Sequence, residues 1–268
     1  LNIPAGDALT PALAGGGGFN GVYNVTVTVT DTAGNSTSEA STGELTVTDT
    51  TAPVIDLDPS NGGSVNHSAT TTLGAAVSLD DNADEATVVE ASDKLTSLDI
   101  TVAGLLDGAS EKLIFGSTTV AADGSSGTQS DITVGGVRVN VTYAGGVFTL
   151  QKYDFTTLTA AEAQAVIRNI QYQNTAGAVT GGNRTFAFTA TDDAGNTSAA
   201  ATSTVNVIGV VNAAASTLTP TSASITANGS STQVLTVTAK DAAGNNIGTG
   251  GATVTITKLS GTGTISAV

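Results

Sequence analysis

The stretch Tyr23-Asn-Val-Thr-Val-Thr-Val-Thr-Asp31-Thr-Ala-Gly34-Asn35 decides the fold class that this sequence predicts. Val25, Val27 and Val29 alternate with threonines, a pattern typical of a strand with one buried and one exposed face. The residues that follow favour a tight turn, because Asp and Asn bond their own backbone and Gly accepts a positive φ. The stretch therefore predicts an antiparallel strand that ends in a hairpin turn.

The same turn phrase recurs at two later places in the chain. Asp193-Ala-Gly195-Asn196 follows the alternating residues 184–191, in which Phe186 and Phe188 are expected to point inward. Asp241-Ala-Ala-Gly244-Asn245 follows a third alternating stretch, residues 233–240. Three such units predict an all-β fold, made of antiparallel immunoglobulin-like β-sandwiches in tandem.

The composition agrees with a β fold and argues against several classes of function. The 268 residues include no Cys, Met or Trp and 32 glycines, and the small and β-branched residues that dominate suit pleated sheets. A net charge of −15 disfavours nucleic acids and anionic membranes, which attract cationic proteins. Because disulfides are impossible, an exported chain needs another stabilising element, and bound calcium is one.

One short helix is predicted in the middle of the chain. Thr159-Ala-Ala-Glu162 matches a capping box, in which each side chain satisfies a free backbone N–H of the other residue. Apolar residues follow at helical spacing and are expected in the core: Ala163, Val166, Ile167 and Ile170. Tyr172 and Asn174 are expected to leave this helix in a loop, and Gly181-Gly182 to begin the return strand.

Linkers divide the chain into three predicted units, residues 1–52, 53–211 and 212–268. Asp49-Thr-Thr-Ala-Pro53 marks the first joint, since Pro cannot donate to a β-ladder, and the uncharged residues 209–216 mark the second. The outer units are shorter than the roughly 100 residues of a sandwich. We therefore expect the closing strands of one domain, an extended middle domain and the opening strands of a third. In an alternative arrangement, copies of the chain complete one another and form a fibre.

Parts of the sequence resemble repeats of bacterial surface adhesins. Residues 23–35 with the linker to Pro53 resemble the end of an immunoglobulin-like or cadherin-like repeat, and residues 167–174 with 182–196 are similar to the extended repeats of giant surface proteins. Residues 222–229 with 237–245 resemble the opening of an invasin- or intimin-type repeat. The resemblance implies a rod of β-sandwiches on a bacterial cell surface that serves adhesion, biofilm or surface-layer structure, with calcium at the domain joints.

Calcium binds six to eight oxygen ligands, so acidic residues at the joints are the candidate ligands. We expect them at the first joint, at the second joint and in the acidic run that begins at Asp80. The candidate residues are Asp31, Asn35, Asp49, Asp56, Asp58, Asp80, Asp81, Asp84, Asp192, Asp193 and Asn196. Adjacent Asp192 and Asp193 point to opposite faces if the strand continues, so only one of them would bind. Alternatively, these side chains only build their own turns.

No enzymatic function is expected. His67 is the single histidine and lies in a polar stretch, no nucleophile elbow or phosphate-binding loop is present, and no Trp offers a sugar-binding platform. The predicted function is an extracellular spacer or adhesive segment. The alternatives are a self-assembling surface-layer or filament subunit and a carbohydrate- or ice-binding module.

The expected partners are neighbouring repeats or other copies of the chain, together with cell-surface glycans or proteins. Nucleic acid and membrane insertion are not expected, because the charge is acidic and no apolar run reaches 18 residues. Any export signal is expected to lie outside this segment.

Overall fold

The chain is built from β-strands with one short α-helix, as the sequence predicts. The computed structural model describes residues 21–83, 85–226, 228–247, 254–255, 257 and 260–261. The described part of the chain contains no helix with the length and hydropathy that crossing a bilayer requires.

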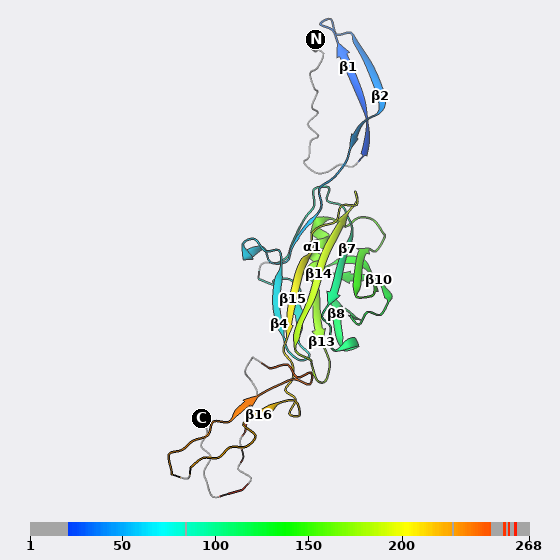
Figure 1. Cartoon of the computed structure of the whole chain (residues 1–268). Helices are drawn as coiled ribbons and strands as arrows, with labels where there is room; N and C mark the ends of the chain where they lie inside the picture. The colour runs from blue at the N-terminus through cyan, green and yellow to red at the C-terminus, as the bar shows by residue number, and fades with distance from the viewer. Residues whose placement is uncertain are drawn as a thin grey trace.

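A two-stranded hairpin forms the N-terminal end of the described chain (Figure 1). Strand β1 (Gly21–Thr30) pairs antiparallel with β2 (Ser36–Val47), and neither has another partner among the described strands. The expectation that Val29 faces a core is wrong, because its side chain is 54% exposed. Among the described residues, no second sheet covers this part of the hairpin.

The middle of the chain is a β-sandwich of two sheets. The larger sheet has the order β10-β11-β12-β7-β14-β15-β4 and the smaller one β5-β13-β8-β9, while β3 and β6 form a separate pair. The bounds of these strands are β3 Val54–Asp56, β4 His67–Thr71, β5 Ala76–Ser78, β6 Thr87–Val89, β7 Leu95–Ala103, β8 Glu111–Phe115, β9 Thr118–Ala121, β10 Gly127–Val134, β11 Val137–Ala144, β12 Val147–Lys152, β13 Ile170–Asn174, β14 Gly182–Asp192 and β15 Ala201–Val207. Two 3-10 turns, η1 (Pro59–Asn61) and η2 (Gly108–Ser110), connect them.

One strand pair departs from the predicted antiparallel arrangement. β4 lies parallel to β15, from His67 opposite Ser203 to Thr71 opposite Val207. A parallel pair requires a long connection, and nearly the whole sandwich separates these two strands in sequence.

Aromatic side chains fill the space between the two sheets. Phe115 of β8 meets Phe148 of β12 with ring centroids 5.8 Å apart, and Tyr172 of β13 meets Phe186 of β14 at 5.2 Å. Phe186 and Phe188 are fully buried, which confirms their predicted inward orientation. Both contacts join one sheet to the other, so they define the core of the sandwich.

Helix α1 (Ala160–Ile167) begins at the predicted capping box. Thr159 Oγ1 accepts from the Glu162 N–H at 3.1 Å, and Glu162 Oε2 accepts from the Thr159 N–H at 2.9 Å. The loop predicted at Tyr172 and Asn174 is wrong, since both are buried in β13, an inner strand of the smaller sheet. Residues 170–174 alternate between buried and more exposed positions, so a period of two takes over where the helical period ends.

The C-terminal part contains one short strand pair among its described residues. β16 (Thr217–Thr219) pairs antiparallel with β17 (Thr236–Thr238), which is shorter than the strand predicted over residues 233–240. Leu235 and Val237 are 43% and 40% exposed, so the strand face that the alternation predicted to be buried is partly exposed.

Candidate functional site

The three turn phrases fold alike, with an aspartate that binds its own turn. Oδ1 of Asp31, Asp192 and Asp241 accepts the N–H of the second residue that follows at 2.9, 2.9 and 3.0 Å. The Asn four residues on donates its side-chain amide to Oδ2 at 2.8, 2.8 and 3.0 Å. Each of these aspartates therefore builds its own turn, and the second copy begins at Asp192, one residue earlier than its quoted phrase.

At the first joint, three separate segments bring buried carboxylates together. Asp49 comes from the linker after β2, Glu90 follows β6, and Asp192 ends β14. One carboxylate oxygen from each lies within 4.8 Å of the other two. The residues are only 5%, 8% and 1% exposed, so water screens this acidic cluster poorly.

Two oxygens of the cluster have no hydrogen-bond partner in the described structure. Asp49 Oδ1 accepts from the Thr51 N–H at 2.9 Å, and Glu90 Oε1 accepts from the N–H and hydroxyl of Ser92 at 2.8 and 3.0 Å. Asp49 Oδ2 and Glu90 Oε2 are buried and accept nothing. A buried polar atom without a partner is costly, so these oxygens point to a ligand.

The charge of the cluster is also uncompensated. No salt bridge reaches its three carboxylates in the described part of the chain, and nearby Lys94 pairs instead with Asp193 at 3.3 Å. Oxygens bound to one Ca²⁺ at roughly 2.4 Å lie no more than about 4.8 Å apart, and the three oxygens of this cluster meet that condition. A set of oxygen donors of this kind fits Ca²⁺.

The second turn phrase connects this cluster to the linker. Asn196 Nδ2 donates to the backbone oxygen of Asp49 at 3.2 Å while it also holds Asp192. Thus Asp49, Asp192 and Asn196, assigned from the sequence to two different joints, meet at one place. Asp193 points elsewhere, toward Lys94.

Four other candidate residues lie outside the cluster and serve local turns. Asp31 and Asn35 bond each other at the exposed tip of the hairpin, far along the chain from the sandwich. Asp56 accepts from the Asp58 N–H at 3.0 Å, and Asp58 accepts from the Ser60 hydroxyl at 2.9 Å.

In the acidic run after β5, the two described candidate residues bond groups of their own segment. Buried Asp80 accepts from the Ser78 hydroxyl at 2.6 Å and the Ala86 N–H at 3.3 Å, and Asp81 accepts from the Ala83 N–H at 2.9 Å. Asp84 lies outside the described residues. Within the acidic stretch of residues 80–93, the residue that joins the cluster is Glu90, which the sequence did not single out because no turn phrase marks it.

One comparison with known proteins bears on the C-terminal part of the chain. Residues 212–268 match the family model described as invasin, domain 3. None of the curated proteins or solved structures compared with the chain is a match. The match confirms the invasin-type resemblance at this end of the sequence. The segment 212–268 is thus similar to the third domain of invasin, an immunoglobulin-like domain of a bacterial surface adhesin.

Proposed function

We propose that the chain is a rod-like spacer in an extracellular bacterial adhesin, and that Ca²⁺ at Asp49, Glu90 and Asp192 stiffens its first joint. The observation that carries this proposal is the buried cluster with two oxygens that accept no hydrogen bond. The invasin-type repeat at residues 212–268 supports the adhesin context. The units 1–52, 53–211 and 212–268 are proposed as successive modules.

The stiffening follows from which segments supply the ligands. Asp49 belongs to the linker, whereas Glu90 and Asp192 belong to the sandwich. Without a cation, mutual repulsion of the carboxylates pushes Asp49 away from the sandwich. A shared ion reverses this force and connects the hairpin to the sandwich, with carbonyl or water oxygens completing its coordination.

Isothermal titration calorimetry with CaCl₂ tests the binding on the chelator-treated whole chain. We expect binding to the wild type, with a stabilisation of about 2.7 kcal/mol at a Ca²⁺ concentration 100 times the Kd. Glu90→Gln keeps the shape of the side chain but removes a charge, and it should weaken binding at least about 10-fold.

Asp58→Asn is the matched control for this experiment. Asp58 is an acidic residue of the same region but bonds Ser60 rather than the cluster, so its variant should bind Ca²⁺ like the wild type. Equal loss of binding in both variants, or none in Glu90→Gln, would contradict the assignment.

The proposed partners are the neighbouring repeats of the same chain. Electron microscopy and sedimentation distinguish this spacer from the self-assembling alternative, because the spacer predicts monodisperse elongated monomers and the alternative predicts fibres. Specific binding on a glycan array would instead favour the carbohydrate-binding module.

A further inference from the structure

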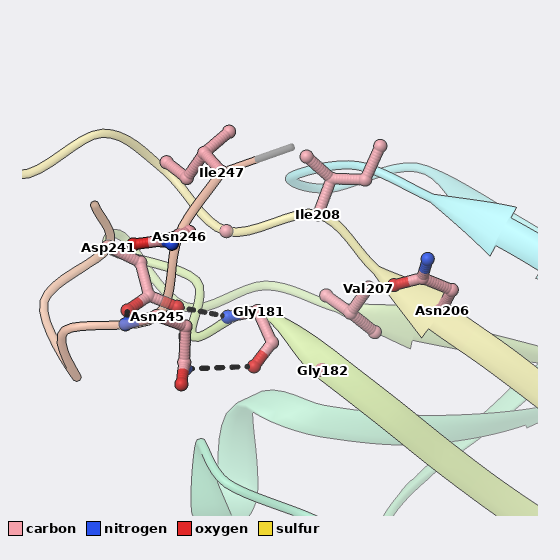
Figure 2. Close-up of a pocket in the computed structure, with 10 residues that line it drawn as sticks. Gly181, Gly182, Asn206, Val207, Ile208, Asp241, Asn245, Asn246 and Ile247 are labelled. Atoms are coloured by element: carbon pink, nitrogen blue, oxygen red, sulfur yellow. Dashed lines mark hydrogen bonds between the residues drawn. The ribbon is translucent and has the colours of Figure 1, made fainter. Parts of the chain in front are cut away.

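The third turn phrase contacts the sandwich directly. Figure 2 shows Asp241 and Asn245 beside Gly181, which lies just before β14. Asp241 Oδ2 accepts from the Gly181 N–H at 2.7 Å, and Asn245 Nδ2 donates to the Gly181 oxygen at 3.3 Å. The turn thus recognises both the donor and the acceptor of one residue on the neighbouring unit.

Unlike the first joint, this contact leaves no carboxylate oxygen unsatisfied. Asp241 Oδ1 accepts from the N–H groups of Ala243 and Asn245 at 3.0 and 2.9 Å. Oδ2 accepts from Gly181 and from the Asn245 side chain at 2.7 and 3.0 Å. Four N–H donors surround a fully buried carboxylate, so the site is complete without a cation.

Two glycines provide the room for Asp241. A Cβ on Gly209 would lie 2.8 Å from Asp241 Cβ and 2.9 Å from the Gly181 nitrogen. A Cβ on Gly181 would lie 3.1 Å from Asp241 Oδ2. The clash at Gly209 involves the backbone nitrogen of Gly181, which cannot rotate away. Asp241 therefore fits against Gly181 and Gly209, here called the Gly181–Gly209 seat, only if residue 209 has no side chain.

Buried charges hold the seat in position on both sides of Gly181. Arg184 is fully buried and donates to the backbone oxygens of Thr180 and Gly182 at 2.9 and 3.0 Å. Asp107 accepts from the Thr180 N–H at 3.0 Å. These bonds fix the backbone on both sides of Gly181, and so they orient its N–H and carbonyl oxygen toward the C-terminal unit.

The linker adds two hydrogen bonds to the joint. The Val210 N–H donates to the Val179 oxygen at 3.1 Å, and the Asn212 N–H donates to the Lys240 oxygen at 2.7 Å. Beside the contact, the described residues leave a cavity of about 340 Å³ that includes Ile208 and Ile247 in its lining (Figure 2). The hydrogen bonds at Gly181 therefore matter more here than they would in a fully packed interface.

We infer that residues 241–245 form a docking turn that locks the C-terminal unit onto the Gly181–Gly209 seat of the sandwich without a bridging cation. The rod then has two kinds of joint. The first joint needs Ca²⁺, and the second is held by direct hydrogen bonds whether or not Ca²⁺ is present.

Single-molecule energy transfer on the whole chain tests this inference. The chain has no Cys, so Ala109→Cys on the sandwich and Thr221→Cys beyond the second joint give a unique pair of exposed label sites. We expect a narrow distance distribution that is the same in CaCl₂ and in chelator. Gly209→Ala should broaden it at least about twofold in both conditions, because the added methyl group displaces Asp241.

Gly177→Ala is the matched control, since a Cβ there meets nothing within 4 Å. Asp241→Ala should loosen the joint as well, but it also removes hydrogen bonds within its own turn, so Gly209→Ala is the decisive variant. A distribution that narrows only when Ca²⁺ is added, or one that Gly209→Ala leaves unchanged, would overturn the inference. Neither result would bear on Ca²⁺ binding at Glu90.

Discussion

At the scale of single residues, two adjacent glycines allow the cost of a steric clash to be measured apart from the cost of an unfavourable backbone conformation. Gly135 and Gly136 form the turn between β10 and β11, with φ of 58° and 82°. A Cβ on Gly135 would lie 2.0 Å from the Ala165 oxygen of helix α1, whereas a Cβ on Gly136 meets nothing within 4 Å. Packing against the helix therefore restricts only the first glycine.

We predict that Gly136→Ala lowers the free energy of unfolding by about 1–2 kcal/mol, because alanine disfavours the left-handed region. Gly135→Ala should lower it by roughly a further 2 kcal/mol, because the helix must also shift. Urea unfolding of both variants measures the difference. Equal destabilisation would mean that α1 does not press on this turn.

A second pair of residues compares a buried charge with an exposed one. Arg184 contacts Glu111 at 2.5 Å with both side chains fully buried, and Glu111 also accepts from the Tyr172 hydroxyl at 2.6 Å. Arg138 pairs with Asp131 where both side chains are about half exposed. If one partner is removed, water can solvate the remaining charge of the exposed pair Arg138–Asp131, but it cannot reach the remaining charge of the buried pair Arg184–Glu111.

Arg184→Met should therefore destabilise the sandwich by about 3–5 kcal/mol, since it leaves buried carboxylates without their cation. Arg138→Met should cost no more than about 1 kcal/mol. Thermal and urea unfolding measure both values. A small effect at Arg184 would show that the buried network is not essential for the stability of the sandwich.

Single residues also show where sequence reasoning stops. The turn chemistry of Asp31, Asp192 and Asp241 follows from local residue types, because each side chain bonds a backbone only a few positions away. The role of Glu90 could not be predicted, since its partners Asp49 and Asp192 come from distant segments. Only the folded sandwich brings these carboxylates together.

At the scale of elements, the spacing of apolar residues predicted the helices and strands in which one periodicity, helical or alternating, holds throughout. Strand β14 and the start of α1 follow from clear alternation and from a capping box. Strand β13 was missed because Ile170 fits both the helical spacing before it and the strand alternation after it. For β17 the prediction was instead too long, because the alternation runs over residues 233–240 whereas only Thr236–Thr238 pair.

The docking turn is the element whose stability should respond to pH. Burial acts to raise the pKa of Asp241, but hydrogen bonds from Asn245 and Gly181 outweigh it and hold the pKa below the usual 3.8. In the unfolded chain this pKa returns toward 3.8, so ionised Asp241 stabilises the folded unit above that value. The contribution is lost as pH falls through the lowered pKa.

We therefore predict that the wild type loses more stability than Asp241→Asn between pH 5 and pH 2.5, because only the wild type has this group to protonate. The comparison matters because the chain has 23 acidic residues, and the variant removes only one of them. Thermal unfolding at a series of pH values gives the difference curve. Parallel curves for the two proteins would contradict a docked, ionised Asp241.

At the scale of the whole molecule, one strand connects the two joints. β14 runs the length of the sandwich between β7 and β15, from Gly182 beside the seat to Asp192 in the cluster (Figure 1). Eleven residues of strand span roughly 33 Å. The sandwich thus has a different connection at each end of β14.

Removal of Ca²⁺ should loosen one end of this body only. With chelator, we predict faster cleavage by proteinase K in the linker around Asp49 and a broader distance distribution between labels at Thr42→Cys and Ala109→Cys. The Ala109–Thr221 distribution should not change. The same cleavage pattern with and without chelator would argue against a cation at the first joint.

The two joints should also be energetically independent, because sites more than about 10 Å apart with no shared partners have nearly additive effects. Glu90→Gln should broaden only the Thr42–Ala109 distribution in CaCl₂, and Gly209→Ala only the Ala109–Thr221 distribution. The double variant should then show both changes at their single-variant size. If either substitution altered the far joint, β14 would have to shift along its length between two arrangements, and the rigid sandwich assumed for the rod would be wrong.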